Sequence, residues 1–315
     1  MPESAVAQGW SPRRIPGVAY ALVGLGMFFS IFARGFLSAP NLVNVGAQSA
    51  ILLIVALPMT LIIMAEGLDL SAGAVLGLSG VTLSLALVQG APLPVAFLLA
   101  LAVGSTFGAI NGLLVAVADI PPFVATLGTM GVAEGLAVAL TDGRSVVGIG
   151  STLPALYAGK FIGAPFAVWA AVLTYAVFHV LLYRTRFGAY VFALGGNREA
   201  LVLAGLGANR YHILVYVLGG LLSGFGALLL TGRMSAGHPT AAIGMEFDAI
   251  AAVIVGGTRF ERGNGWLPGT ALGVITVGIL KNGLNVMAVS SSLQVASIGV
   301  LVIAALLVDS IRERR

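Results

Sequence analysis

A few carboxylates inside long apolar runs are the residues with the clearest chemical potential. Asp69 precedes one such run, Glu134 lies in the middle of another, and Asp248 begins a third. Glu134 facing lipid would cost about 2.5 kcal/mol or more, so it should face a cavity, a cation or another helix. These carboxylates are therefore candidates for a translocation pathway, and structural roles are the simpler alternative.

Asp69 has two interpretations. Gly67 permits a turn, and Asp69 or Ser71 can cap the exposed N–H groups of the following helix, where a carboxylate suits the positive end of the dipole. The other interpretation is a pathway residue at a break between helices. The cap is the simpler of the two, and Glu246 and Asp248 repeat the same pattern at the start of a later apolar segment.

Glu134 has no adjacent partner in the sequence, so a buried structural pair and a pathway role both stay open. A second polar patch follows Lys281, with Asn282, Asn285 and a serine-rich stretch at 290–294. Its amides and hydroxyls could offer weak hydrogen bonds to a polyol-like solute. The alternative is an ordinary hydrated helix hairpin.

The composition defines the class of protein in which these residues work. Only 9% of the 315 residues are charged, 58% are hydrophobic, and the mean hydropathy is +1.03. Soluble proteins carry about 25% charged residues. We therefore exclude a soluble enzyme, a disordered chain and a nucleic-acid-binding domain, although the formal net charge is +4. The absence of Cys excludes disulfides and thiol chemistry, and three separated His residues indicate no metal site. The sequence predicts an all-α polytopic membrane protein in a lipid bilayer.

Apolar runs long enough to cross a bilayer determine the expected helices, because a span needs about 20 residues. The sequence predicts ten segments, and the eighth is short enough for a broken or half helix. Eight to ten spans are expected. The segments are 16–33, 41–64, 71–89, 92–118, 123–140, 164–183, 212–232, 248–257, 266–287 and 292–309.

These segments form one expected transmembrane domain, 16–309, with cytoplasmic tails at 1–15 and 310–315. Arg13 and Arg14 precede the first run, which we interpret as an uncleaved helix in preference to a twin-arginine signal peptide. With the N-terminus inside, basic residues concentrate on the cytoplasmic side. Only five of the 16 Lys and Arg then face outward, namely Arg34, Arg144, Lys160, Arg233 and Lys281.

A weak internal similarity connects the two halves. Asn111-Gly112-Leu113 in the fourth segment is matched by Asn282-Gly283-Leu284 in the ninth, and glycines recur every four residues in both. Such spacing lets helix backbones approach closely. The partners are five segments apart, so the second copy would be inverted, as in many transporters. An inverted repeat and chance similarity stay open.

The loop 184–211 contains a capped helical segment of about seven residues. Asn197 suits the N-cap, and Arg198, Glu199 and Ala200 follow it, with Glu199 suited to the first turn. Gly205 can end the helix. Such a helix could bind a cytoplasmic partner or be a surface turn. Neither lysine lies in a G-x-x-x-x-G-K-[ST] loop, so any energy must come from ions or another subunit.

Several motifs in order resemble the membrane permease subunits of ribose/xylose-type bacterial ABC importers. They include Gly67-Leu68-Asp69-Leu70-Ser71-Ala72-Gly73, the run from Ile120 to Met130 (IPPFVATLGTM), Gly195-Gly196-Asn197 and Asp248-Ala249-Ile250 through Gly256-Gly257-Thr258. The resemblance covers roughly residues 40 to 309. Where relatives often carry a basic residue after the Thr-Leu-Gly-Thr-Met motif, this chain has Glu134.

The resemblance implies a type II-like ABC importer permease that has no catalytic site and binds no cofactor, because a cytoplasmic ATPase subunit binds the ATP. Its other expected partners are a second permease subunit and an extracytoplasmic solute-binding protein. By this analogy Asn197, Arg198, Glu199, Ala200 and Gly205 form the coupling helix. Pathway residues would be Asp69, Ser71, Asn111, Glu134, Asp248, Asn282 and Asn285. A permease for branched-chain amino acids or nucleosides, and an ion-coupled secondary transporter, are the alternatives.

Overall fold

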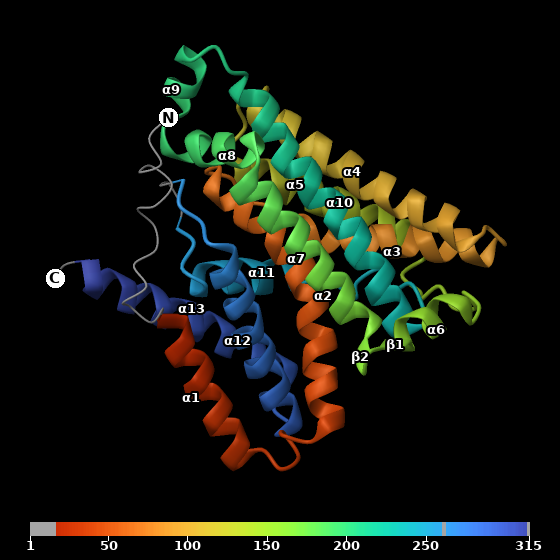
Figure 1. The fold of residues 1–315 in the computed structure, drawn as a ribbon. Helices are drawn as coiled ribbons and strands as arrows, with labels where there is room; N and C mark the ends of the chain where they lie inside the picture. Colours follow the sequence, from red (N-terminus) through yellow and green to blue (C-terminus); the bar gives the residue numbers. More distant parts are fainter. Residues whose placement is uncertain (1–16, 260–262, 314–315) are drawn as a thin grey trace.

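A computed structural model describes residues 17–259 and 263–313, and these residues are mostly helical (Figure 1). A helix occupies each of the ten predicted segments. These helices are α1 (Gly17–Phe32), α2 (Ala39–Met64), α3 (Ala72–Val88), α4 (Leu93–Ala116), α5 (Pro122–Ala139), α7 (Phe166–Arg184), α10 (Ala208–Met234), α11 (Met245–Val255), α12 (Leu267–Val286) and α13 (Ser291–Glu313). The predicted tail 1–15, with Arg13 and Arg14, lies outside the described residues.

Six of these helices are long and apolar enough to cross a membrane, namely α2, α4, α5, α7, α10 and α12. Helices α1 and α3, and the first fifteen residues of α13, are apolar but shorter. Proline occupies one of the first two positions of α2, α4, α5 and α12, where its missing N–H costs no helical hydrogen bond. The predicted polytopic membrane protein is therefore confirmed. Helix α13 continues to Glu313, beyond the predicted end at 309.

Helices α2 and α10 form the centre of the bundle. Each contacts several other helices, and α10 packs most extensively against α4. Glycine makes this approach close, because a Cβ on Gly104 would collide with the backbone of Gly220, and one on Gly108 with the carbonyl of Tyr216. The predicted close approach through four-residue glycine spacing is confirmed here and between Gly273 of α12 and Ala252 of α11.

Two irregular segments interrupt the bundle, and both lie within it. The first, residues 65–71, is called the helix break below and connects α2 to α3. The predicted turn is present, and its left-handed residue is Glu66, with φ of 60°. The second, residues 235–244, precedes α11 and lies along α3, because a Cβ on Gly77 would meet Pro239 and one on Gly237 would meet Ser84.

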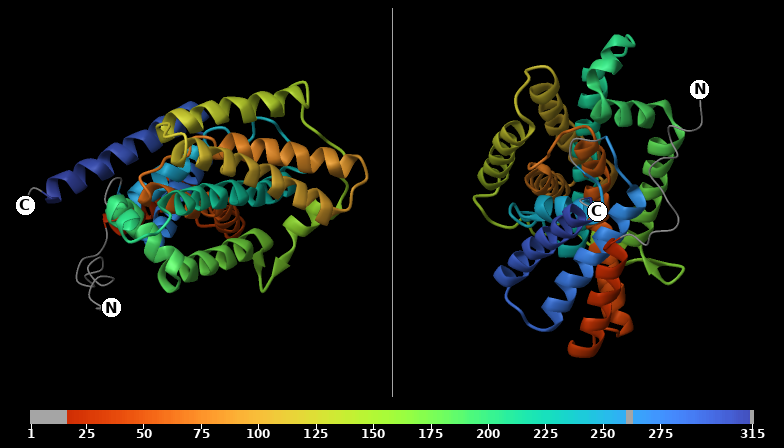
Figure 2. Two further views of the ribbon diagram at one scale, coloured as in Figure 1. Left: turned by 90° about the horizontal axis from the view of Figure 1, so that it is seen from above. Right: turned by 90° about the vertical axis from the view of Figure 1, so that its left-hand side faces the viewer.

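The two long loops carry structure that the apolar pattern did not predict. The loop 141–163 contains α6 (Thr152–Ala158) and β1 (Lys160–Phe161), which pairs antiparallel with β2 (Ala164–Pro165). The loop 184–211 contains α8 (Arg186–Gly196) and α9 (Arg198–Leu203). Figures 1 and 2 show α8 and α9 at one end of the bundle, and Figure 1 shows the β1–β2 hairpin and α6 at the other.

Candidate functional site

Asp69 lies at the centre of a buried hydrogen-bond network at the helix break. Its side chain is 2% exposed, and its Oδ1 accepts hydrogen bonds from Ser71 N at 2.9 Å and from Ser71 Oγ at 2.6 Å. Ser71 is the residue before α3, so the carboxylate lies at the positive end of that helix dipole. No side chain of Asp69 or Ser71 forms a cap hydrogen bond to the N–H groups of α3, so the predicted cap is not formed, and the Asp69 carboxylate bonds Ser71 instead.

Asn111 extends the network to two further helices. Its Nδ2 donates to Ser71 Oγ at 2.8 Å, and its Oδ1 accepts from Thr129 Oγ1 at 2.6 Å. Asn111 belongs to α4 and Thr129 to α5, so this chain of contacts joins α3, α4 and α5. We call Asp69, Ser71, Asn111 and Thr129 the break network. The structure thus brings together three of the predicted pathway residues and adds Thr129.

Two hydroxyl groups hold the backbone of the helix break from opposite helices. Thr126 Oγ1 on α5 accepts from Leu70 N at 3.1 Å. Tyr216 on α10 accepts from Leu68 N at 3.3 Å and donates to Leu68 O at 3.2 Å. Sequence reasoning missed both residues as site residues. Thr126 lies in a quoted motif, whereas Tyr216 lies in an apolar run with no local signal.

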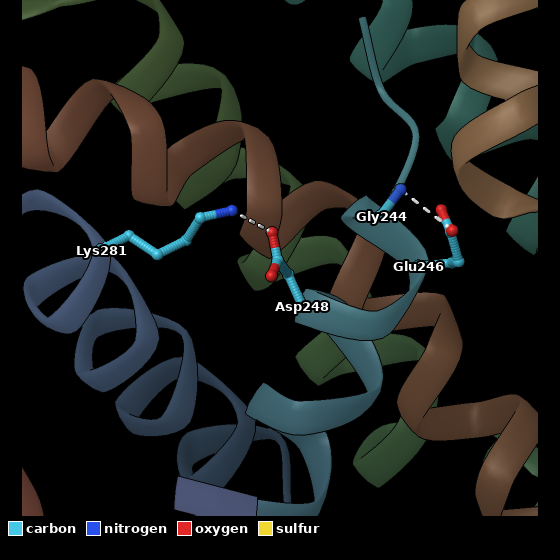
Figure 3. A network of polar contacts seen from close by, with 4 residues as sticks. All are labelled: Gly244, Glu246, Asp248 and Lys281. Atoms are coloured by element: carbon cyan, nitrogen blue, oxygen red, sulfur yellow. Dashed lines mark hydrogen bonds and ion pairs between the residues drawn. The ribbon is translucent and has the colours of Figure 1, made fainter. Parts of the chain in front are cut away.

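A second polar cluster lies at the start of α11 (Figure 3). Glu246 Oε1 accepts from Gly244 N at 3.0 Å, whereas Asp248 Oδ2 pairs with Lys281 Nζ of α12 at 2.5 Å. Asp248 was predicted to cap this helix, and that prediction is wrong. The helix begins at Met245, so Asp248 lies beyond the first three positions, where free N–H groups need a cap.

Glu246 connects the second cluster to α3. Its side chain is 2% exposed, and its Oε2 has no hydrogen-bond partner among the described residues. This oxygen occupies the space that a Cβ on Gly73 would need, one residue after the start of α3. The same Cβ would lie 2.5 Å from Ala242 O, so the second irregular segment packs against the N-terminal end of α3, which directly follows the helix break.

The remaining predicted pathway residues lie apart from these clusters. Asn282 is buried and exchanges hydrogen bonds with Asn41 of α2, at 2.8 and 3.0 Å, so it joins α12 to α2. Asn285 is exposed. Glu134 is half-buried on α5 and makes no hydrogen bond or ion pair to any described residue. Of the two alternatives left open for Glu134, the buried structural pair is therefore not present among the described residues.

Helix α9 has the predicted capped geometry. The Asn197 side chain accepts from Ala200 N at 2.8 Å, Glu199 lies in the first turn, and Gly205 has φ of 75° after the helix ends. Its neighbour Arg198 donates to Asn209 Oδ1 of α10 at 2.9 Å. Helix α9 is therefore tied to the beginning of α10.

The described residues contain no group of three His, Cys, Asp or Glu that could hold a metal ion. Instead, several apolar helices surround buried carboxylates, amides and hydroxyls at two helix interruptions. Such polar sites within a membrane bundle are typical of solute pathways. Fold and site together define the class as a polytopic membrane transport protein.

Sequence comparison identifies the family. The chain belongs to the family described as branched-chain amino acid transport system permease components, whose model matches residues 41–307. It is 38% identical to the ribose import permease protein RbsC of Bacillus subtilis (strain 168) over 292 residues, which cover 90% of this chain and 91% of the relative.

Two further relatives agree with this assignment. RbsC of Escherichia coli (strain K12) is 38% identical over 93% of this chain and 92% of its own length. The D-allose transport system permease protein AlsC of the same strain is 32% identical over 90% and 88%. No solved structure matches the chain. The resemblance to ABC importer permeases is thereby confirmed.

Proposed function

We propose that this chain is the permease subunit of an ATP-driven ABC importer and forms the pathway for a ribose-like monosaccharide. The observation that carries this proposal is 38% identity to ribose import permeases over nine tenths of the chain. ATP is bound by a separate cytoplasmic subunit, and a solute-binding protein delivers the sugar. The name of the family model favours a branched-chain amino acid as the alternative solute, but the relatives with the highest identity reported above import sugars.

The proposed pathway runs past the break network and the start of α11. A sugar presents hydroxyl groups that exchange hydrogen bonds with carboxylates, amides and hydroxyls. Asp69, Ser71 and Asn111 supply such groups, and they are buried where two helices begin. Asp248, Asn282 and Asn285 are assigned to the pathway of the second half. Helix interruptions at such depth are tolerated where they line a cavity or are enclosed by protein.

An inverted repeat of five helices is part of this proposal, with ten spans and both termini in the cytoplasm. Matching contacts support it. In the repeat, α2, α3, α4 and α5 correspond to α10, α11, α12 and α13. Helix α3 packs on α4 and α5, and α11 packs in the same way on α12 and α13. Across the two halves, α10 packs on α3 and α4, and α2 packs on α11 and α12. In this topology α8 and α9 face the cytoplasm, and the β1–β2 hairpin faces outward.

A second permease subunit covers the outer face of α5. Gly128, Gly131 and Gly135 on this face have no other atoms within 4 Å of a built Cβ, and Glu134 lies beside them without a partner among the described residues. Lipid is a poor neighbour for a carboxylate, whereas small residues at this spacing favour helix–helix contact. In this proposal Glu134 lies at the interface between the two subunits.

Helix α9 is the proposed docking element for the ATPase. Leu203 is 88% exposed and Val202 is 56% exposed, on a helix that lies at the end of the bundle (Figure 1). Apolar side chains exposed next to Arg198 and Glu199 fit a protein interface with an apolar centre and a charged rim. In the proposed coupling helix, Val202 and Leu203 are therefore the side chains that contact the ATPase.

Co-purification from the native membrane in mild detergent tests this proposal. The wild-type chain should carry a stoichiometric ATPase subunit, and replacing 197–205 with a flexible linker should release it. The matched control replaces 160–165, the hairpin at the opposite end, and should retain the ATPase. A transport-active chain that carries no ATPase would contradict the proposal.

A further inference from the structure

Tyr216 is a fully buried tyrosine whose hydroxyl group, among the described residues, forms hydrogen bonds only with the helix break. Its exposure is 0%, and its hydroxyl forms hydrogen bonds with both backbone groups of Leu68. A buried phenol needs such partners, and so do backbone groups that no helix satisfies. The hydroxyl therefore contributes to the position of the break as well as to packing.

The helix break and α10 are shaped to fit around this hydroxyl. A Cβ on Gly67 would lie 2.6 Å from the Tyr216 hydroxyl oxygen and 2.9 Å from Ile62 Cγ2, so only glycine allows the observed approach. One turn further along α10, a Cβ on Gly219 would lie 3.6 Å from Asp69 Oδ2. One face of α10 thus contacts residues 67–69.

The same face of α10 continues to α9. The His212 ring lies 5.7 Å from the Tyr216 ring between centroids, and Asn209 accepts the hydrogen bond from Arg198. Positions 209, 212, 216 and 219 are three or four residues apart, so they lie on one side of the helix. One side of α10 therefore runs from the hydrogen bond with Arg198 of α9 to the contacts with residues 67–69.

We propose that Tyr216 is a positioning residue that couples α9 to the helix break. Its hydroxyl holds Leu68, and thereby Asp69, against α10, so that a displacement of α10 by the ATPase moves the break with it. This inference rests on the proposed function, because it assigns the step between ATP hydrolysis and opening of the pathway. Tyr216 itself need not touch the sugar.

The test uses the complete importer in proteoliposomes and measures sugar uptake and ATP hydrolysis separately. Tyr216→Phe keeps the ring and removes only the hydroxyl. We expect unchanged ATPase binding and hydrolysis, and about a tenfold loss of sugar imported per ATP hydrolysed. The matched control is Tyr175→Phe on α7, because no described residue forms a hydrogen bond with the Tyr175 hydroxyl. This control should leave the ratio unchanged.

A second variant addresses the same contact from the other side. Gly67→Ala should push the tyrosine away while keeping its hydroxyl, and it should lower the same ratio. An unchanged ratio in Tyr216→Phe, or equal losses of uptake and hydrolysis, would overturn the inference. A wild-type complex that shows no ATP-dependent uptake would instead contradict the proposed function, and with it this inference.

Discussion

Lys281 Nζ lies 2.5 Å from Asp248 Oδ2, and this ion pair joins α12 to α11 (Figure 3). The Asp248 side chain is 13% exposed and that of Lys281 is 38% exposed. The carboxylate is therefore more deeply buried than its partner, and it depends on the ammonium group for compensation. The short helix α11 is anchored to its neighbour by charge as well as by glycine packing.

Removal of Lys281 should therefore destabilise the protein more than its exposed position indicates. Lys281→Ala leaves a mostly buried carboxylate unpaired, at a cost of about 1–3 kcal/mol after allowance for solvent screening. The thermal midpoint of the purified chain should fall, and the double variant Asp248→Asn/Lys281→Ala should recover most of the loss. A double variant as unstable as Lys281→Ala would contradict this account.

The helices could be predicted from the sequence, but the hydrogen bonds and ion pairs between helices could not. Long apolar runs must form helices in a bilayer because their backbone groups have no other partners there, so each predicted segment coincides with a helix. Contacts such as Leu68 with Tyr216 join residues 148 positions apart. No local pattern encodes them. Asp248 was misassigned for the same reason, since its partner Lys281 lies 33 residues away.

Short structural features could be predicted only where the residues that form them are neighbours in the sequence and leave a recognisable pattern. The cap at Asn197 was predictable, because side chain and N–H group are three residues apart. The hairpin at 160–165 was not, since strands of two residues have no alternation to detect. Glu66 adopts the left-handed conformation at the turn, while the adjacent Gly67 lies where Tyr216 approaches, and this long-range contact has no local signal.

The break network should be sensitive to loss of its central amide. Asn111→Ala leaves the hydroxyls of Ser71 and Thr129 with fewer partners in a buried site, so it should destabilise the chain by about 1–3 kcal/mol. Thermal unfolding in detergent measures this change. Asn44→Ala, at an exposed asparagine of α2, is the matched control and should stay within about 0.5 kcal/mol of the wild type. Equal effects at both positions would argue against a structural role for the network.

The cap of α9 should determine how well the ATPase binds. Asn197→Ala removes the hydrogen bond to Ala200 N and should cost the helix about 1 kcal/mol, which weakens ATPase binding about fivefold. Asn197→Ser retains a capping oxygen and should bind like the wild type. Titration of the ATPase against the detergent-solubilised permease gives both affinities. Equal affinity of the alanine variant would exclude a role for the cap.

Close packing of α4 on α10 should not tolerate a methyl group. A Cβ on Gly108 would collide with the backbone of α10, so Gly108→Ala should force the helices apart and cost about 1–3 kcal/mol. Gly24→Ala on α1 is the control, because nothing lies within 4 Å of its built Cβ. The measurement compares the thermal unfolding midpoints of both variants with that of the wild type. A Gly108→Ala protein as stable as the wild type would contradict the prediction that α4 and α10 must pack this closely.

Glu134→Gln should change transport more than folding. The carboxylate makes no contact with a described residue that the amide would break, so expression and thermal stability should remain near wild type. Uptake should change, because Glu134 is one of the predicted pathway residues and lies at the proposed interface between the two subunits. The comparison is uptake normalised to the amount of folded protein. Parallel losses of expression and uptake would assign Glu134 a structural role.

The most direct test of the central claim is ribose uptake into proteoliposomes that contain the permease, its ATPase and its solute-binding protein. The account predicts uptake that requires ATP and all three components, and that persists when an ionophore collapses the proton gradient. Uptake by the permease alone, driven by a proton or sodium gradient without ATP, would contradict the importer assignment and identify an ion-coupled transporter.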